Sequence, residues 1–192
     1  MKRSYFLLFT VYSLLFSVFL WGCGSGTGSP GSSGSEDTGI RIKAVSITRE
    51  SPDIDVYSES VITREDATLT IESEKLNPGS SFDPFPASIE ECTITYKKAI
   101  EDPSAPMIES LTIYPNCTMG GCVATCPESC TVTLIDISRK QTYWNAIGQA
   151  TNVPEEYPTH YIAEYNCKYM NNLDKTGYFK TEYDMWLADF VD

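Results

Sequence analysis

Seven cysteines are the residues of this chain with the clearest capacity for chemistry. Four of them lie within residues 117–130 with the spacing C-x4-C-x3-C-x3-C, and four thiolates so close together can hold a zinc ion or an iron–sulfur cluster. The segment lacks the C-x2-C pair of zinc sites and the C-x2-C-x2-C run of bacterial ferredoxins. We therefore predict no metal and no cofactor, and two local disulfides that fix a loop. Its cysteines are Cys117, Cys122, Cys126 and Cys130.

Cys92 and Cys167 stand apart from this cluster. Each falls on the apolar side of a segment in which polar and apolar residues alternate, so both side chains can point toward one core. Cys23 follows an N-terminal export signal, described below, and is counted separately. The six cysteines that remain are an even number, which is typical of a disulfide framework in an exported chain. The sequence leaves the full set of pairings open, but the shared apolar face favours a bridge between Cys92 and Cys167.

Histidine and carboxylate chemistry has less support. The one histidine, His160, sits in a predicted loop beside Thr and Tyr, where a surface position is more usual than a catalytic one. Carboxylates crowd two stretches after residue 48, where they could hold Ca²⁺ or act as a glycosidase acid and base. Because no Gly-centred calcium loop is present, we predict a solvated acidic face. Its residues are Glu50, Asp53, Asp55, Glu59, Glu65 and Asp66.

Aromatic residues make up 12% of the chain, and most fall at inward positions of predicted strands. Tyr143, Trp144 and Tyr157 differ, because they lie in segments predicted as loops. Exposed rings can stack on sugars or anchor a protein partner. These three residues are therefore the candidate binding aromatics.

The charge of the chain limits its partners. It has 14 basic and 26 acidic residues, a formal net charge of −12. Phosphate binding needs clustered Lys and Arg, so we exclude nucleic acid as a partner. The same balance argues against electrostatic docking onto anionic lipid.

The first 22 residues have the order of an export signal. Two basic residues precede residues 5–21, an apolar run slightly short for a membrane-spanning helix. The run ends in Leu20-Trp21-Gly22-Cys23, which resembles the lipobox of bacterial lipoproteins, with Trp where that pattern more often has a small residue. The resemblance implies cleavage between Gly22 and Cys23, a diacylglycerol on Cys23 and a place in the cell envelope. By the same resemblance, the glycine that follows favours the outer membrane.

Three parts are predicted along the chain. Residues 1–22 form the signal peptide. Cys23 and the Gly/Ser-rich residues 24–39 form a lipidated, disordered linker that lets a folded body clear the membrane surface. Residues 40–192 form a single domain, which is long enough for one hydrophobic core and short for two.

From residue 40 onward the dominant period is two, as Tyr161, Ala163 and Tyr165 show by alternating with more polar neighbours. We predict an all-β, antiparallel sandwich. The last two strands form a hairpin closed by residues 171–177, and helix is limited to one turn at 145–149. The predicted strands are 40–48, 67–72, 92–97, 110–114, 131–138, 161–170 and 178–190.

Tyr165-Asn166-Cys167 resembles the Tyr-x-Cys of an immunoglobulin-type F strand, with the following strand as G. This resemblance implies an immunoglobulin-like or fibronectin-like order of strands in the sandwich. An OB-type or jelly-roll arrangement remains an alternative.

These features predict a protein that is not an enzyme. We expect a lipid-anchored module of the cell envelope whose edges or loops hold a protein or glycan partner, although a fold by itself assigns no function. The alternative is a redox or metal-binding accessory that uses the 117–130 cysteine cluster. A hydrolase built on the acidic residues is the third hypothesis.

The variant Cys23→Ala is expected to lose both its acyl groups and its membrane attachment, because two or more acyl chains are what make such anchoring stable. Metabolic labelling with a fatty-acid probe and membrane fractionation measure the two effects. The neighbouring variant Ser25→Ala should keep both. A Cys23→Ala protein that stays equally membrane-bound would contradict the lipid anchor.

Overall fold

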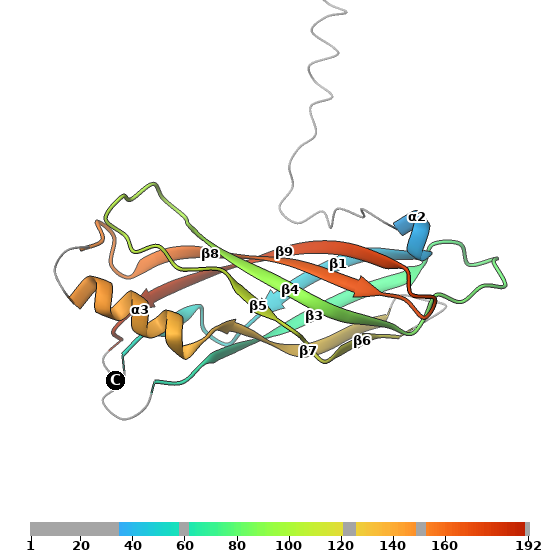
Figure 1. Cartoon of the computed structure of the whole chain (residues 1–192), viewed down its shortest axis with the longest axis horizontal. Coiled ribbons are helices and arrows are strands. Elements are labelled where there is room, and N and C mark those ends of the chain that lie inside the picture. The colour runs from blue at the N-terminus through green and yellow to red at the C-terminus, as the bar shows by residue number, and fades with distance from the viewer. Residues whose placement is uncertain (1–34, 58–61, 121–125, 149–152, 191–192) are drawn as a thin grey trace, which may run out of the picture.

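The computed structural model describes residues 35–57, 62–120, 126–148 and 153–190 (Figure 1). Gly22, Cys23 and most of the predicted linker lie outside the described residues. Within the described ranges, no helix is both long and apolar enough to cross a membrane.

Alternating apolar and polar residues build two sheets in the described part of the chain. In the smaller sheet, neighbouring strands are antiparallel and their order is β1 (Ile40–Thr48), β3 (Glu65–Lys75) and β7 (Cys126–Ile135). In the larger sheet, the order is β2 (Asp53–Asp55), β9 (Thr176–Ala188), β8 (Thr159–Met170), β4 (Ala87–Lys98) and β5 (Leu111–Ile113), with β6 (Cys117–Met119) also paired to β4. The all-β prediction is confirmed.

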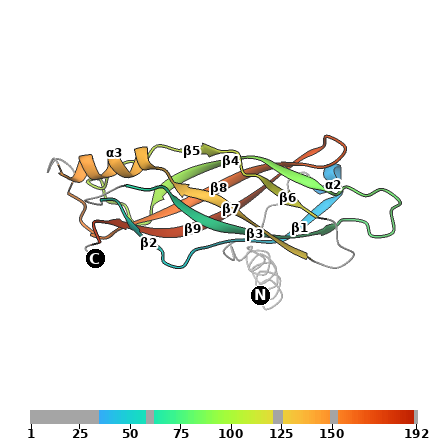
Figure 2. The ribbon, with the colours of Figure 1, turned by 90° about the horizontal axis from the view of Figure 1, so that it is seen from below.

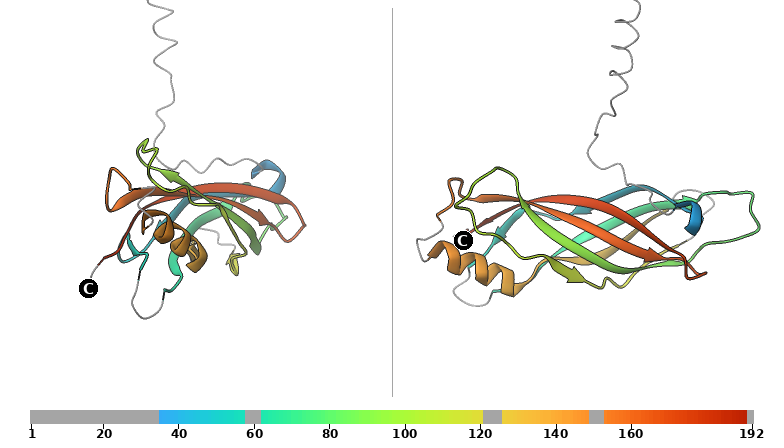
Figure 3. Two further views of the ribbon diagram at one scale, coloured as in Figure 1. Left: turned by 60° about the vertical axis from the view of Figure 1, so that its left-hand side comes forward. Right: turned by 45° about the horizontal axis from the view of Figure 1, so that its top comes forward.

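The larger sheet curls over the smaller one, and the two inner faces share one core (Figures 2 and 3). Buried side chains from both sheets fill it, including Leu69, Ile94, Leu134, Tyr165 and Phe179. The body is elongated, with the short helix α2 (Ser35–Thr38) at one end and α3 (Ile137–Gly148) with the C-terminus at the other (Figure 1).

Tyrosine hydroxyl groups join the two sheets. Tyr96 on β4 donates to the carbonyl of Leu134 at 2.7 Å, and Tyr165 on β8 donates to the carbonyl of Thr133 at 3.0 Å. Both acceptors belong to β7 of the smaller sheet. Burial raises the pKa of Tyr96 and of Tyr165, which keeps both hydroxyls in the neutral form that can donate.

The chain enters the body through an ordered turn. Thr38 at the end of α2 is fully buried, and its carbonyl accepts a bond of 2.9 Å from the side-chain amide of Asn171. Gly39 follows with a φ of 69°, a left-handed conformation that glycine adopts without strain. Residues 35–39, assigned to the flexible linker from the sequence, are therefore part of the folded body.

The helix α3 corrects the expectation of a single turn at 145–149 and of a strand reaching residue 138. Asp136 caps it by accepting the backbone N–H of Arg139 at 2.9 Å. Its buried side chains are Lys140 and Tyr143. Because this buried face carries a charge and a phenol, it lacks the apolar repeat at helical spacing that identifies a helix from sequence.

Lys140 takes part in a buried ionic network. Its ammonium group donates to Glu65 at 2.9 Å and to the carbonyl of Thr63 at 3.0 Å, and the other carboxylate oxygen of Glu65 binds Arg49 at 2.6 Å. Lys140 is only 2% exposed. The prediction that Glu65 belongs to a solvated acidic face is therefore wrong, because this carboxylate holds α3 against the sheets.

The predicted hairpin of the last two strands is confirmed, since β8 and β9 pair in continuous antiparallel register. The expected 117–130 loop contains β6 and the start of β7, and β2 was not anticipated. The finer prediction, an immunoglobulin-like strand order, is not confirmed by this topology.

The variant Glu65→Gln is expected to lower the free energy of unfolding by about 3 kcal/mol, because it leaves the buried Lys140 ammonium without its carboxylate. Urea denaturation measures the change. Adding Lys140→Met should restore part of the loss. The exposed Glu128→Gln should cost less than about 0.5 kcal/mol. Equal stability of Glu65→Gln and wild type would contradict this role.

Candidate functional site

Cys92 and Cys167 form the disulfide that the sequence favoured. The two residues are directly opposite on the neighbouring strands β4 and β8, with 4.0 Å between their Cα atoms. Both are fully buried. This bridge fixes the middle of the larger sheet and places no reactive sulfur at the surface.

Within the cysteine cluster, the structure describes one bridge, Cys117–Cys130. It connects β6 to β7 and therefore the larger sheet to the smaller one. Cys122 lies outside the described residues, and of Cys126 only the backbone position at the start of β7 is described. In the described part of the chain, no group of three or more His, Cys, Asp or Glu side chains is placed to hold a metal ion.

The candidate binding aromatics do not form one surface. Tyr143 is buried, and its hydroxyl is 2.6 Å from that of Thr159, so its ring belongs to the core. Trp144 is half-buried and stacks on Tyr57 with ring centres 4.8 Å apart. Tyr157 is 50% exposed, and its hydroxyl accepts the backbone N–H of Asp189 at 2.6 Å.

Polar side chains instead gather on the outer face of the larger sheet. Side chains alternate between the two faces of a strand, so the buried Tyr165 leaves Glu164 and Asn166 on the outside. The register sets Glu164 opposite Glu182 and Asn166 opposite Lys180. These residues thus form two adjacent rows across β8 and β9.

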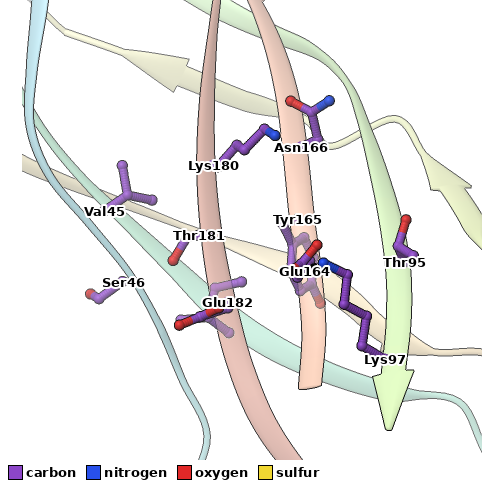
Figure 4. A pocket seen from close by; sticks show the side chains of 11 residues that line it. Val45, Ser46, Thr95, Lys97, Glu164, Tyr165, Asn166, Lys180, Thr181 and Glu182 are labelled. Carbon is purple, nitrogen blue, oxygen red and sulfur yellow. Dashed lines mark hydrogen bonds and ion pairs between the residues drawn. The ribbon is translucent and has the colours of Figure 1, made fainter. Parts of the chain in front are cut away.

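A hollow of about 600 Å³ lies on this side of the molecule (Figure 4). We call it the groove. Its walls are residues 45–47 of β1, 164–166 of β8 and 180–182 of β9, with Thr95 and Lys97 of β4. The volume is within the range of roughly 300–1,000 Å³ that is usual for ligand sites.

The groove separates two strand edges. β1 and β9 run in the same direction (Figure 1) and lie side by side, yet β1 pairs with β3 and β9 pairs with β8. No backbone hydrogen bond joins β1 to β9 in the described ranges. Residues 45–47 and 180–182 both line the hollow as consecutive triplets. In the described ranges β1 is the terminal strand of its sheet, and before Trp186 β9 pairs only with β8, so each of these two strands presents an unpaired edge to the groove.

The charged side chains of the groove are partly paired. The ammonium of Lys97 binds the carboxylate of Glu164 at 2.5 Å. In the described part of the molecule, Lys180, Glu182 and Asn166 are exposed and make no side-chain hydrogen bond or ion pair. They present one cation, one anion and one amide, so the groove can donate and accept hydrogen bonds without a strong preference for either charge.

His160 lies farther along the same outer face. Its ring stacks on Trp186 with centres 4.3 Å apart and planes 10° from parallel, and its Nε2 is 2.8 Å from a carboxylate oxygen of Asp184. The prediction of a loop position is wrong, because His160 is the second residue of β8. These contacts fix the ring between the side chains of two residues of β9.

The comparisons assign no family. A scan against protein-family models and searches of curated proteins and of solved structures found no match. The groove residues were not predicted as a site. The alternation in β8 and β9 does identify Asn166, Lys180 and Glu182 as outward-facing, but nothing in the sequence places β1 beside them.

Tyr143 gives a test of its placement in the core. Burial raises the pKa of Tyr143 to about 12, above the ordinary value of 10.0. Between these pH values the unfolded chain loses this proton while the folded chain keeps it, so the free energy of unfolding falls as the pH rises. In Tyr143→Phe, the decline between about pH 10 and 12 should be shallower than in wild type. Denaturant titrations across this range measure it, and equal slopes would contradict a buried phenol.

Proposed function

We propose that this protein is a lipid-anchored binding module of the cell envelope, held by Cys23 at the outer membrane, that carries a polar partner in the groove. The observation that supports it most directly is the hollow of about 600 Å³, whose lining includes the exposed side chains of Asn166, Lys180 and Glu182, which make no side-chain hydrogen bond or ion pair in the described structure. Such side chains remain hydrated in the free protein and are available to a ligand.

The position of the chain entry supports the tethered part of the proposal. The described chain begins with α2, at one end of the long axis of the body, and Cys23 precedes it in the sequence (Figure 1). The groove is lined by residues 45–47 of β1 and 180–182 of β9, and α2 contributes no residue to it (Figure 4). An anchor at one end therefore leaves this side open to a partner in the same compartment.

The rigidity of the groove supports a binding role. Its floor belongs to strands fixed by the Cys92–Cys167 bridge and by a continuous β8–β9 register. A backbone held in paired strands loses little freedom when a ligand binds, so less of the binding free energy is lost to ordering the main chain. A module of this kind needs no moving part to receive its partner.

The variant Thr95→Arg is expected to abolish partner binding, because it places a long charged side chain in the groove. Thr68→Arg is the matched control, since it makes the same change at an exposed strand position of the smaller sheet. The full lipidated proteins, in detergent, serve as bait for envelope extracts, and the components retained by wild type are quantified on each variant.

The proposal is supported if a component is retained by wild type and Thr68→Arg but not by Thr95→Arg. It is overturned if every retained component binds all three proteins equally, because the groove would then be irrelevant to capture. It is also overturned if nothing is retained above the level of beads without bait.

A further inference from the structure

The backbone of β9 presents unpaired groups to the groove. The N–H of Trp186 donates to the carbonyl of Pro52 at 3.1 Å, and the carbonyl of Ala188 accepts from Val56 at 2.9 Å, so both groups point away from β8. The β8–β9 register has no irregularity, and backbone groups alternate along a strand. The N–H and C=O groups of Lys180, Glu182 and Asp184 therefore point to the same side as those of Trp186.

This edge already accepts a strand elsewhere. β2 pairs with it in parallel, from Asp53 opposite Trp186 to Asp55 opposite Ala188. Earlier in β9, beside the groove, no described segment pairs with the edge. Proteins commonly protect free edges with charged side chains, which hinder pairing, or with a proline or a bulge, which prevents it. Residues 176–185 of β9 have charged side chains but neither proline nor bulge, whereas β1 has a register shift between Ile42 and Ala44.

The side chains of β1 and β9 that line the groove indicate which side chains a bound segment would need. Val45 and Ile47 on β1 contribute apolar surface, and both pack with the core. Lys180 and Glu182 on β9 contribute exposed charges of opposite sign. A strand paired with the edge of β9 would place alternate side chains on the outer face, beside Lys180 and Glu182, and on the inner face, toward Val45 and Ile47.

We infer that the partner is a polypeptide whose extended segment, alternating in apolar and polar residues, adds as a strand to the free edge of β9 in the groove. This inference rests on the proposed function and specifies the class of partner. Main-chain hydrogen bonds supply affinity in this mode of recognition, and the alternate side chains supply selectivity. Along the edge of β9, the N–H and C=O groups that face the groove recur every second residue. An extended peptide has the same spacing of N–H and C=O groups, so it can pair with them.

The decisive variants change one position in two ways. Glu182→Pro removes an edge N–H that points into the groove, and edge positions of this kind tolerate proline. Glu182→Thr keeps that N–H and removes the carboxylate. The probe is a displayed library of random eight-residue peptides, selected on the full lipidated protein in detergent, with enriched peptides then synthesised. Dissociation constants for wild type and both variants are compared, and thermal melting confirms that each is folded.

Strand addition predicts that Glu182→Pro weakens peptide binding by about tenfold or more while Glu182→Thr stays within about threefold. Amide hydrogen exchange gives a second measurement. In free wild type, the amides of Lys180 and Glu182 should exchange faster than that of Thr181, whose N–H faces β8, and bound peptide should slow the exchange of the first two. If Glu182→Pro does not fold, this exchange pattern alone decides.

Peptides that bind Glu182→Pro as tightly as wild type, or that leave the exchange of Lys180 and Glu182 unchanged, overturn the inference. So does the absence of any enriched peptide. If Thr95→Arg still blocks capture of an envelope component in those cases, the groove binds by another chemistry, and the proposed function stands without strand addition. If Thr95→Arg has no effect, the proposed function itself fails.

Discussion

The two sheets depend on hydrogen bonds from buried tyrosines to the main chain. Tyr96 and Tyr165 extend from the inner face of the larger sheet and donate to adjacent carbonyls of β7 in the smaller sheet. A buried carbonyl without a partner would cost roughly 1–3 kcal/mol, so these phenols set the separation of the sheets as well as filling the core. Leucine at either position would pack but could not satisfy the carbonyl. These two positions therefore have a structural reason to be tyrosine rather than an aliphatic residue.

This arrangement also explains why the groove is beside β1. The bonded tyrosines and the Cys117–Cys130 bridge hold the β7 side of the smaller sheet against the larger one. At its opposite edge, β1 pairs with β3, and farther along the chain β2 joins β9. The chain passes from the smaller sheet to the larger one between β1 and β2. β1 and β9 therefore belong to different sheets, and their edges do not pair.

Much of the fold was predictable because it depends on local alternation. The period of two identified β1, β8 and β9 together with the facing positions of Cys92 and Cys167, since one buried face imposes a register on each strand. Helix α3 was missed because Lys140 and Tyr143 are its buried residues. The groove could not be predicted, because it depends on β1 and β9 being neighbours without pairing. That relation involves residues more than a hundred positions apart and leaves no pattern in either strand.

The Cys117–Cys130 bridge has a mechanical consequence. It crosses between the sheets on the side of β6 and β7, while the unpaired edges of β1 and β9 face each other on the other side. The two sheets are thus linked covalently on one side and have unpaired strand edges on the other. Together with the hydrogen bonds of Tyr96 and Tyr165, the bridge fixes the distance between the sheets on the side away from the groove, which keeps the shape of the groove constant. Reduction would remove this covalent link and leave the alignment of the two sheets to the tyrosine hydrogen bonds and the shared core.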